Sequence, residues 1–303
     1  MNPANLDLQT LRVFVAVARE GNVSKAAEQM HRSQPAVSLQ LKRMAEITGL
    51  TLFHRTAHGL VLSADGAALL PQAERALHAI QDVANAVSRL HGTVRGKLRI
   101  GTILEPSFIR LGDWLGQLVQ SAPQIETELR HGMSGSVMAQ LQQGSLDVCF
   151  YLSPDREATH QLQPDLAVRT LTRFEYRVVA PAGWGPQVTG CDWEALATLP
   201  WLATPPESVH SRLLAGIFGP RGLAPRRAAL VDQEPSMLDL IKSGVGLSLV
   251  RDATAMRESQ TSGLAVADRV RIGCELQFVC LASRLEEALI VEALGALNRV
   301  WLD

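Results

Sequence analysis

Three polar side chains recur at four-residue intervals near the start of the chain: Gln34, Ser38 and Lys42. In a helix, this spacing places all three on one face. Gln can hydrogen-bond an adenine at two atoms, Ser can bond a base edge or a phosphate, and Lys neutralises phosphate or reaches guanine. The pattern therefore predicts a helix that reads the major groove of double-stranded DNA. The alternative is a solvated outer face of a small helical bundle, since such polar faces are common.

The segments before this face predict the scaffold that positions it. Apolar residues at helical spacing indicate a helix over residues 7–19, and two small residues, Ala26-Ala27, allow a second helix to cross the third closely. Ser33 is expected to cap the third helix with its hydroxyl, and the first turn of that helix tolerates Pro35. Together these residues predict a helix-turn-helix.

A short hairpin is predicted directly after the third helix. Residues 55–62 contain a turn between apolar ends, which is typical of a two-stranded wing. Arg55 and His58 would there lie over the DNA backbone or the minor groove. The charge agrees with this interpretation, because residues 1–64 contain seven Lys/Arg against four Asp/Glu in a chain whose net charge is −1. The basic part of the chain is thus the part that would meet DNA.

The next segment predicts a helix that pairs with a partner helix. Apolar residues between 64 and 87 are separated alternately by three and four positions, a 3.5-residue repeat. We expect this seam to dimerise the protein. The alternative is a helix that packs on its own chain. The residues assigned to the dimer seam are Leu70, Leu77, Ile80 and Val87.

Strands alternate with helices over the rest of the chain, which predicts an α/β architecture. The first set includes a strand over 97–101, a helix over 106–120 and strands over 125–130 and 146–152. A second set spans 176–256, and the chain returns through a strand at 276–282 and a final helix. This order indicates two α/β subdomains.

Ligands of such folds bind in the crevice at the carboxyl ends of strands, where helix N-termini favour anions. Ser134 and Ser208 have a simpler interpretation as helix caps, and Glu105 as a residue stabilised by a helix dipole. The expected ligand is a small organic effector, with a carboxylate as one candidate because Arg251 is close by. The residues assigned to this cleft are Thr102, Glu105, Ser107, Ser134, Thr204, His210 and Arg251.

The remaining chemistry of the sequence argues against an enzyme. Dinucleotide, phosphate, zinc-protease and hydrolase signatures are absent, and the cysteines Cys149, Cys191, Cys274 and Cys280 form no C-x-x-C pair. We therefore expect no cofactor and no metal. No apolar run is long enough to span a membrane, so a cytoplasmic protein is expected. An α/β enzyme fused to a DNA-binding domain and an architectural DNA binder without an effector are the competing classes.

The N-terminal motifs resemble the winged helix-turn-helix of LysR-type transcriptional regulators. The resemblance lies in Phe14–Ala18, Ala26-Ala27, Ser33–Ser38, Leu52–Arg55 and Leu62–Gly66. It implies that Ser33, Gln34, Pro35, Ser38 and Lys42 approach DNA and that Arg55 and His58 make wing contacts. The sequence departs from the family pattern at Leu39, where a polar base reader is common, and at Met44-Ala45. An apolar Leu39 leaves only contact with a thymine methyl, or none.

The resemblance also implies an organisation and a set of partners. A DNA-binding domain would span 1–63, a dimerising linker helix 64–91, and an effector-binding domain 95–303 of the periplasmic-binding-protein type II-like fold. Subdomain I would comprise 95–167 and 274–303, and subdomain II 168–273. The implied function is sequence-specific regulation of transcription controlled by the effector. The implied partners are promoter DNA and a second copy of the chain, with a homotetramer as the full assembly and RNA polymerase as a further candidate.

Overall fold

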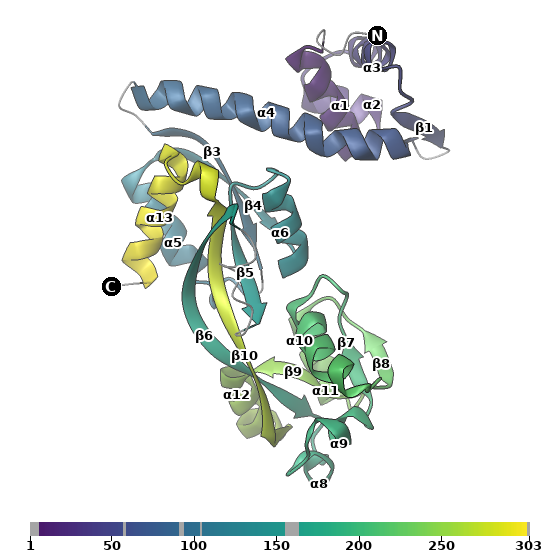
Figure 1. Ribbon diagram of the computed structural model, residues 1–303, viewed down its shortest axis with the longest axis vertical. Helices are drawn as coiled ribbons and strands as arrows, with labels where there is room; N and C mark the ends of the chain where they lie inside the picture. Colours follow the sequence, from purple (N-terminus) through teal and green to yellow (C-terminus); the bar gives the residue numbers. More distant parts are fainter. Residues whose placement is uncertain (1–5, 57–58, 91–93, 104, 155–163, 302–303) are drawn as a thin grey trace.

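The computed structural model describes residues 6–56, 59–90, 94–103, 105–154 and 164–301, with the backbone alone at 78, 81–82 and 84–90. Three helices and a hairpin form the N-terminal head (Figure 1). Asp7 and Asn22 cap the first two helices through their side chains, and Gly21 and Gly49 end the first and third in left-handed conformations. The elements of the head are α1 (Leu8–Glu20), α2 (Val23–Gln29), α3 (Gln34–Thr48), β1 (Phe53–Thr56) and β2 (Gly59–Leu62).

The predicted wing is confirmed as an antiparallel pair in which Thr56 lies opposite Gly59. The wing is held against the head by a backbone hydrogen bond of 2.8 Å from Leu60 N–H to the Gly21 carbonyl. At Gly59 the backbone has φ +134°, and a Cβ there would lie 2.3 Å from the same carbonyl. Glycine at this position therefore permits the close approach of β2 to the end of α1.

A single long helix, α4 (Ala64–Leu90), joins the head to the rest of the chain. Its first half completes the core of the head, where Ala73 is buried with Phe14 and Met44. Leu70 and Leu77 pack against the same cluster. Both leucines remain partly exposed, so their own chain covers only part of each side chain, and their contact with a partner helix stays a prediction.

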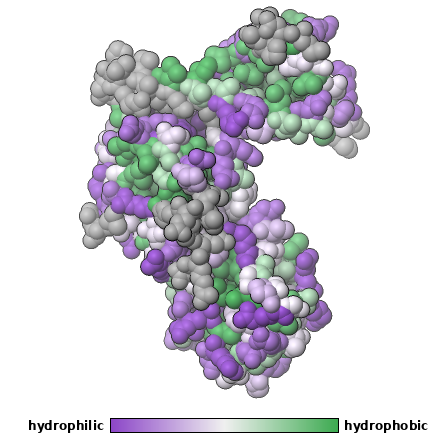
Figure 2. All heavy atoms as spheres, viewed as in Figure 1, coloured by the Kyte–Doolittle hydropathy of each residue, from purple (hydrophilic) through white to green (hydrophobic). Residues whose placement is uncertain are grey.

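The second half of α4 is different. Ile80 and Val83 are 38% and 63% exposed, and Figure 2 shows green, apolar atoms along this part of the helix. The side chain of Val87 lies outside the described residues. Within the described side chains, the apolar surface of α4 that stays uncovered therefore begins at Ile80.

One six-stranded sheet runs through the α/β region, in the order β4-β3-β5-β10-β6-β9. β3 pairs in parallel with β4 and β5, whereas β10 is antiparallel to β5 and β6, and β6 is antiparallel to β9. The alternation of strands and helices predicts a parallel sheet, but the observed sheet is mixed, because the strands that join the subdomains run antiparallel to their neighbours. Its strands are β3 (Arg95–Thr102), β4 (Gln124–His131), β5 (Val148–Pro154), β6 (Leu166–Ala180), β9 (Ser248–Arg251) and β10 (Ala265–Leu281).

The two longest strands carry the chain between the subdomains (Figure 1). β6 and β10 remain paired from Ala167 opposite Cys280 to Ala180 opposite Ala265, with two register shifts. Both strands were expected to be short, over 176–180 and 276–282. They are longer because each continues through both subdomains.

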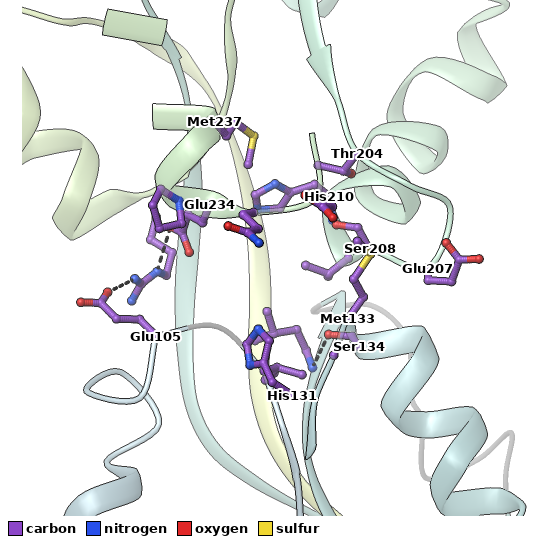
Figure 3. Close-up of a pocket in the computed structure, with 18 of the residues that line it drawn as sticks. Glu105, His131, Met133, Ser134, Thr204, Glu207, Ser208, His210, Glu234 and Met237 are labelled. Atoms are coloured by element: carbon purple, nitrogen blue, oxygen red, sulfur yellow. Dashed lines mark hydrogen bonds and ion pairs between the residues drawn. The ribbon is translucent and has the colours of Figure 1, made fainter. Parts of the chain in front are cut away.

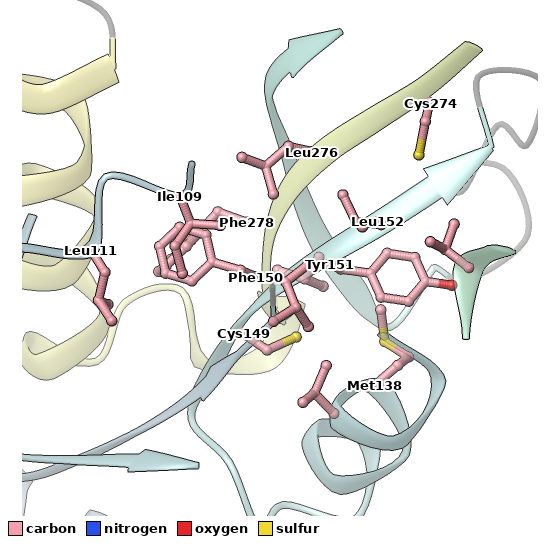
Figure 4. Close-up of a cluster of buried hydrophobic side chains, with 14 of the residues drawn as sticks. Ile109, Leu111, Met138, Cys149, Phe150, Tyr151, Leu152, Cys274, Leu276 and Phe278 are labelled. Carbon is pink, nitrogen blue, oxygen red and sulfur yellow. The ribbon is translucent and has the colours of Figure 1, made fainter. Parts of the chain in front are cut away.

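Helices cover this sheet at both ends. α5 and α13 pack together over subdomain I, and Trp114 on α5 donates a 2.9 Å hydrogen bond to the Ala293 carbonyl on α13. The core beneath contains Phe150 and Phe278 from β5 and β10, with ring centroids 5.3 Å apart (Figure 4). The helices here are α5 (Leu111–Ser121), α6 (Ser134–Gln142) and α13 (Ala288–Trp301).

Subdomain II adds a small parallel pair of strands and its own helices. β7 pairs with β8, and Trp201 on β7 also bridges Leu247 beside β9. A second core forms around Val179, Met237 and Val250. The elements are α8 (Gly185–Val188), α9 (Trp193–Ala197), β7 (Trp201–Ala203), α10 (Val209–Phe218), β8 (Arg227–Leu230), α11 (Glu234–Lys242) and α12 (Asp252–Ser262).

One expected helix begins later than the sequence suggested. A helix was predicted over 106–120, but α5 begins at Leu111 and is preceded by turns. Arg110 has a positive φ of 48°, and the Leu111 N–H donates to the Pro106 carbonyl. The turns bring this segment back toward subdomain II. Among the described residues, no helix is both long enough and apolar enough to cross a membrane.

Candidate functional site

The outward face of α3 presents the polar residues identified in the sequence. Gln34, Ser38 and Lys42 are exposed, while Val37 and Met44 on the opposite face are buried. Lys42 Nζ lies 3.8 Å from a carboxylate oxygen of Glu46, an exposed pair that leaves the ammonium available. The three side chains thus share one face.

The first turn of α3 and the wing extend this surface. Ser33 and Pro35 are exposed at the start of the helix. Ser33 occupies the N-cap position, yet its side chain makes no capping hydrogen bond, which corrects the expectation that its hydroxyl caps the helix. Arg55 is exposed on β1. His58 lies outside the described residues.

A cavity of about 970 Å³ lies between the two α/β subdomains. Subdomain I contributes the segments after β3 and β4 and the start of α6, and subdomain II contributes the segments after β7, β8 and β9 (Figure 3). Five of the seven residues predicted for the cleft line it: Glu105, Ser134, Thr204, His210 and Arg251. Glu105 and Arg251, which are 146 positions apart in the sequence, thus meet at this cavity.

The other two predicted residues lie outside the wall. Thr102 is buried in the sheet, where its hydroxyl is 3.4 Å from the Arg130 carbonyl. Ser107 is exposed and hydrogen-bonds Glu105. Both stand close to the end of β3 in sequence, but the strand pleat and the turns before α5 direct them elsewhere. We do not include either residue in the site.

An ion pair spans the cavity from one subdomain to the other. Arg251 Nη2 lies 2.8 Å from Glu105 Oε2, and Arg251 Nε lies 3.5 Å from Glu234 Oε1. The guanidinium also stacks over the Phe108 ring, 4.3 Å from its centroid. The Arg251 hydrogen bond lowers the pKa of Glu105. Arg251 is therefore held by two carboxylates and an aromatic face.

On the other side of the cavity, α6 contacts subdomain II through its backbone. Gly135 N–H donates a 2.9 Å hydrogen bond to the Glu207 carbonyl, and a Cβ at Gly135 would lie 2.9 Å from that oxygen. The adjacent Ser134 is buried, and its hydroxyl accepts a hydrogen bond of 3.3 Å from Leu152 N–H (Figure 3). Ser134 thus fastens α6 to β5 rather than capping the helix, whereas Ser208 does cap α10 through His210 N–H at 3.2 Å.

Two buried polar side chains of the cavity wall have no hydrogen-bond partner among the described residues. His210 is 5% exposed, and neither of its ring nitrogens is hydrogen-bonded among the described residues. The Thr204 hydroxyl is likewise buried and unpaired. Burial lowers the pKa of His210 to about 4, so the imidazole is neutral at pH 7. Each such group costs about 1–3 kcal/mol unless something satisfies it. Because these atoms are covered, a bound molecule would satisfy them only after the side chains over them move.

The sequence alone did not identify several residues of the wall. Glu207, Asp232 and Glu234 line the cavity, as does Met237. The sequence carried a signal for two of them, since Asp232 lies two residues after the end of β8 and Glu234 begins α11. These are the strand ends and helix starts where ligands of α/β folds bind.

The described residues of the site are polar, charged and apolar side chains that can bind a small molecule. The described part of the chain contains no group of three or more metal-ligating side chains. Cys149, Cys274 and Cys280 are buried free thiols, and burial raises the pKa of Cys280 to about 11. Such thiols are unreactive. The arrangement is suited to holding a small molecule.

Two family models match the chain. Residues 8–67 match a model described as a bacterial regulatory helix-turn-helix protein of the lysR family. Residues 91–300 match a LysR substrate binding domain, which covers more than half of the 303 residues. The boundary between the two matches falls on α4.

Named relatives extend over most of the chain. The HTH-type transcriptional regulator ClcR of Pseudomonas putida is 29% identical over 262 residues, which is 83% of this chain and 84% of ClcR. CfxR of Cupriavidus necator is 25% identical over 263 residues, 87% of this chain and 81% of CfxR.

Solved structures show the same fold over nearly the whole length. Full-length CbnR in complex with its target DNA matches with a TM-score of 0.62 at 20% identity, covering 97% of this chain and 99% of that chain. ArgP from Mycobacterium tuberculosis matches with a TM-score of 0.63 at 18% identity and 97% coverage of both chains. The predicted fold class, a helix-turn-helix head followed by a mixed α/β region, is thereby confirmed.

Proposed function

Because the chain belongs to the LysR family of DNA-binding transcriptional regulators, we propose that a small effector bound in the cavity controls how α3 and the wing engage promoter DNA. The observation that carries this proposal is the cavity between the subdomains, whose buried polar atoms at His210 and Thr204 lack partners. Members of this family regulate transcription, and we propose no catalytic role for the cavity.

The DNA-binding surface comprises the exposed face of α3 and the wing. Gln34 and Ser38 contact base edges, and Lys42 contacts phosphate or guanine. Ser33 and Pro35 lie at the groove edge, and Arg55 and His58 contact the backbone beside it. Leu39 is 66% exposed on the same helix and contacts a thymine methyl.

The organisation follows the connections of the chain. Residues 1–63 bind DNA, 64–91 link and dimerise, and 95–303 bind the effector, with subdomain II as 168–273. The exposed apolar residues Ile80 and Val83 on the second half of α4 support dimerisation there. A homodimer presents two recognition helices to a two-fold symmetric operator, and two dimers form a tetramer. RNA polymerase is a further partner of the promoter complex.

The effector acts by shifting an equilibrium between two arrangements of the subdomains. The effector site comprises Glu105, Ser134, Thr204, His210 and Arg251. The effector would contact both subdomains, so its affinity for a closed arrangement differs from its affinity for an open one. Only this difference in affinity shifts the equilibrium between the two arrangements. The long strands β6 and β10 carry the change between the subdomains, and subdomain I passes it to α4.

Genome-wide mapping of bound DNA tests the proposal. Sites with two-fold symmetry are expected, and the genes beside them indicate which small molecules to add. The electrophoretic mobility of the complex between the protein and its operator DNA is then measured in the presence of each of these molecules. A chain that occupies no discrete sites, or whose complex responds to none of the molecules, would refute DNA binding in the first case and effector control in the second.

A further inference from the structure

The wall of the cavity is more acidic than basic. Glu105, Glu207, Asp232 and Glu234 line it, against the guanidinium groups of Arg251 and Arg257, a formal charge of −2. Glu207 and Asp232 are exposed and form no ion pair among the described residues. Arg257 points largely to solvent, with 64% of its side chain exposed, and lies 3.6 Å from Glu258. An anion entering this cavity would meet a repulsive field.

The single buried cation is already neutralised. Arg251 lies 2.8 Å from Glu105 and 3.5 Å from Glu234, with Phe108 beneath the guanidinium. A ligand carboxylate would have to displace one of these carboxylates and leave it unpaired beside the new charge. Arg251 thus does not act as a vacant anion site.

The helix N-termini around the cavity are also engaged by the chain itself. The Gly135 amide of α6 donates to the Glu207 carbonyl, and the Ser208 hydroxyl accepts from the second residue of α10. α11 begins with Glu234 and Pro235, which supply a negative charge and remove one N–H donor. Groups of the chain itself therefore occupy these helix N-termini, which reduces their attraction for an anionic ligand.

The groups that remain unpaired are neutral. The His210 imidazole is 5% exposed with both nitrogens free of hydrogen bonds, and the Thr204 hydroxyl beside it is buried and unpaired. In Figure 3 both lie at the subdomain II side of the cavity, with Glu207 further out. A hydroxyl, carbonyl or amide group would satisfy them.

We infer that the effector carries no anionic group: an uncharged hydrogen-bonding head sits on His210 and Thr204, and any charge it bears is an ammonium directed at Glu207 and Asp232. This inference rests on the proposed effector function of the same cavity. It excludes the simple carboxylates that Arg251 suggested from the sequence.

The charge that the cavity accepts can be measured without knowing the effector. Ser136→Cys places a thiol on the wall, in a full-length Cys191→Ser background that removes the one native thiol that is not buried. The rates of reaction are compared for methanethiosulfonates that bear a trimethylammonium or a sulfonate group. The ratio of the cationic to the anionic reaction rate is measured at Ser136→Cys and at Gln120→Cys, an exposed position on α5. We expect this ratio to be about tenfold higher at Ser136→Cys.

Charge variants separate the cavity from the rest of the surface. Glu207→Gln with Asp232→Asn should reduce the rate ratio at Ser136→Cys several-fold, whereas Glu286→Gln, an exposed carboxylate outside the cavity wall, should leave it unchanged. A ratio at or below that of Gln120→Cys would overturn the inference. So would a carboxylate that changes the mobility of the operator complex, although the proposed function would then stand. If the rate ratio is high and no molecule acts on the complex, the effector function fails instead.

Discussion

At the residue scale, the proposed DNA-binding face of α3 carries two uncharged polar side chains, Gln34 and Ser38, and one charged side chain, Lys42. Lys42 is exposed, with only a 3.8 Å pair to Glu46, so its main contribution to a DNA complex is release of counterions. Lys42→Ala should weaken binding to all sequences and reduce the salt slope by about one. Gln34→Ala should instead weaken the operator by about 1–3 kcal/mol and leave nonspecific binding intact. Fluorescence anisotropy at several salt concentrations distinguishes the two.

Leu39 provides a matched test of specificity on the same helix. It is 66% exposed and can contribute only apolar contact. Leu39→Ala should lower the preference for thymine at one operator position by about 1 kcal/mol and leave the salt slope unchanged. Binding to a set of operators mutated at each position measures this. Uniform weakening at every position would show that Leu39 reads no base.

The buried His210 should make the stability of the fold depend on pH. Burial lowers its pKa from 6.5 to about 4, so between these values the unfolded chain binds more protons than the folded one. Stability should therefore fall as the pH drops from about 6.5 to about 4, by up to about 3 kcal/mol. In His210→Gln, the free energy of unfolding measured in urea should change less between about pH 4 and about pH 6.5. His131→Gln, an exposed histidine on the same wall, should retain it.

At the scale of elements, the two halves of α4 have different surroundings in the single chain. Leu77 packs in the head of its own chain, whereas Val83 is 63% exposed. Val83→Asp should thus dissociate dimers with little change in stability, because an apolar contact between chains is lost. Leu77→Asp should unfold the head, since it buries a charge. Sedimentation and thermal melting of both variants measure the difference. A dimeric Val83→Asp protein would move the interface to another surface.

The same contrast shows what the sequence could and could not predict. The head was predictable because Gly21, Asn22 and the Ala26-Ala27 pair act through local geometry. The helix over 106–120 was not, since Arg110 adopts a positive φ that only the surrounding fold imposes. The pair of Glu105 with Arg251 joins residues 146 positions apart and has no local signal. Five of the residues predicted for the cleft thus line one cavity, whereas the ion pair between two of them could not be predicted.

At the scale of the whole molecule, the cavity is bridged on two sides. Glu105 pairs with Arg251 on one side, and Gly135 donates to the Glu207 carbonyl on the other. Because both contacts join the same two subdomains, loosening one should loosen the other. Glu105→Gln should speed hydrogen exchange of the Gly135 amide a few-fold, in keeping with the modest strength of an exposed ion pair.

A lower pH should also speed hydrogen exchange of the Gly135 amide in the wild-type chain. The Arg251 hydrogen bond lowers the pKa of Glu105 below its usual 4.5. The pair therefore contributes fully above pH 4.5, and its contribution is lost as the pH falls through the lowered pKa. Exchange at Gly135, corrected for its intrinsic rate, should accelerate over that range in the wild type and not in Glu105→Gln. Equal acceleration in both would show that the two sides move independently.

The strand order also governs how the protein is made. β10 lies in the interior of the sheet between β5 and β6, although it is synthesised last of the strands. At about 5–20 residues per second, the ribosome needs roughly ten seconds to travel from β5 to β10. During that interval the head is already complete, while the edges of β5 and β6 that β10 later joins stay open to unwanted pairing. A nascent chain that stalls between β5 and β10 thus carries a complete DNA-binding domain but lacks the last strand that joins its two subdomains.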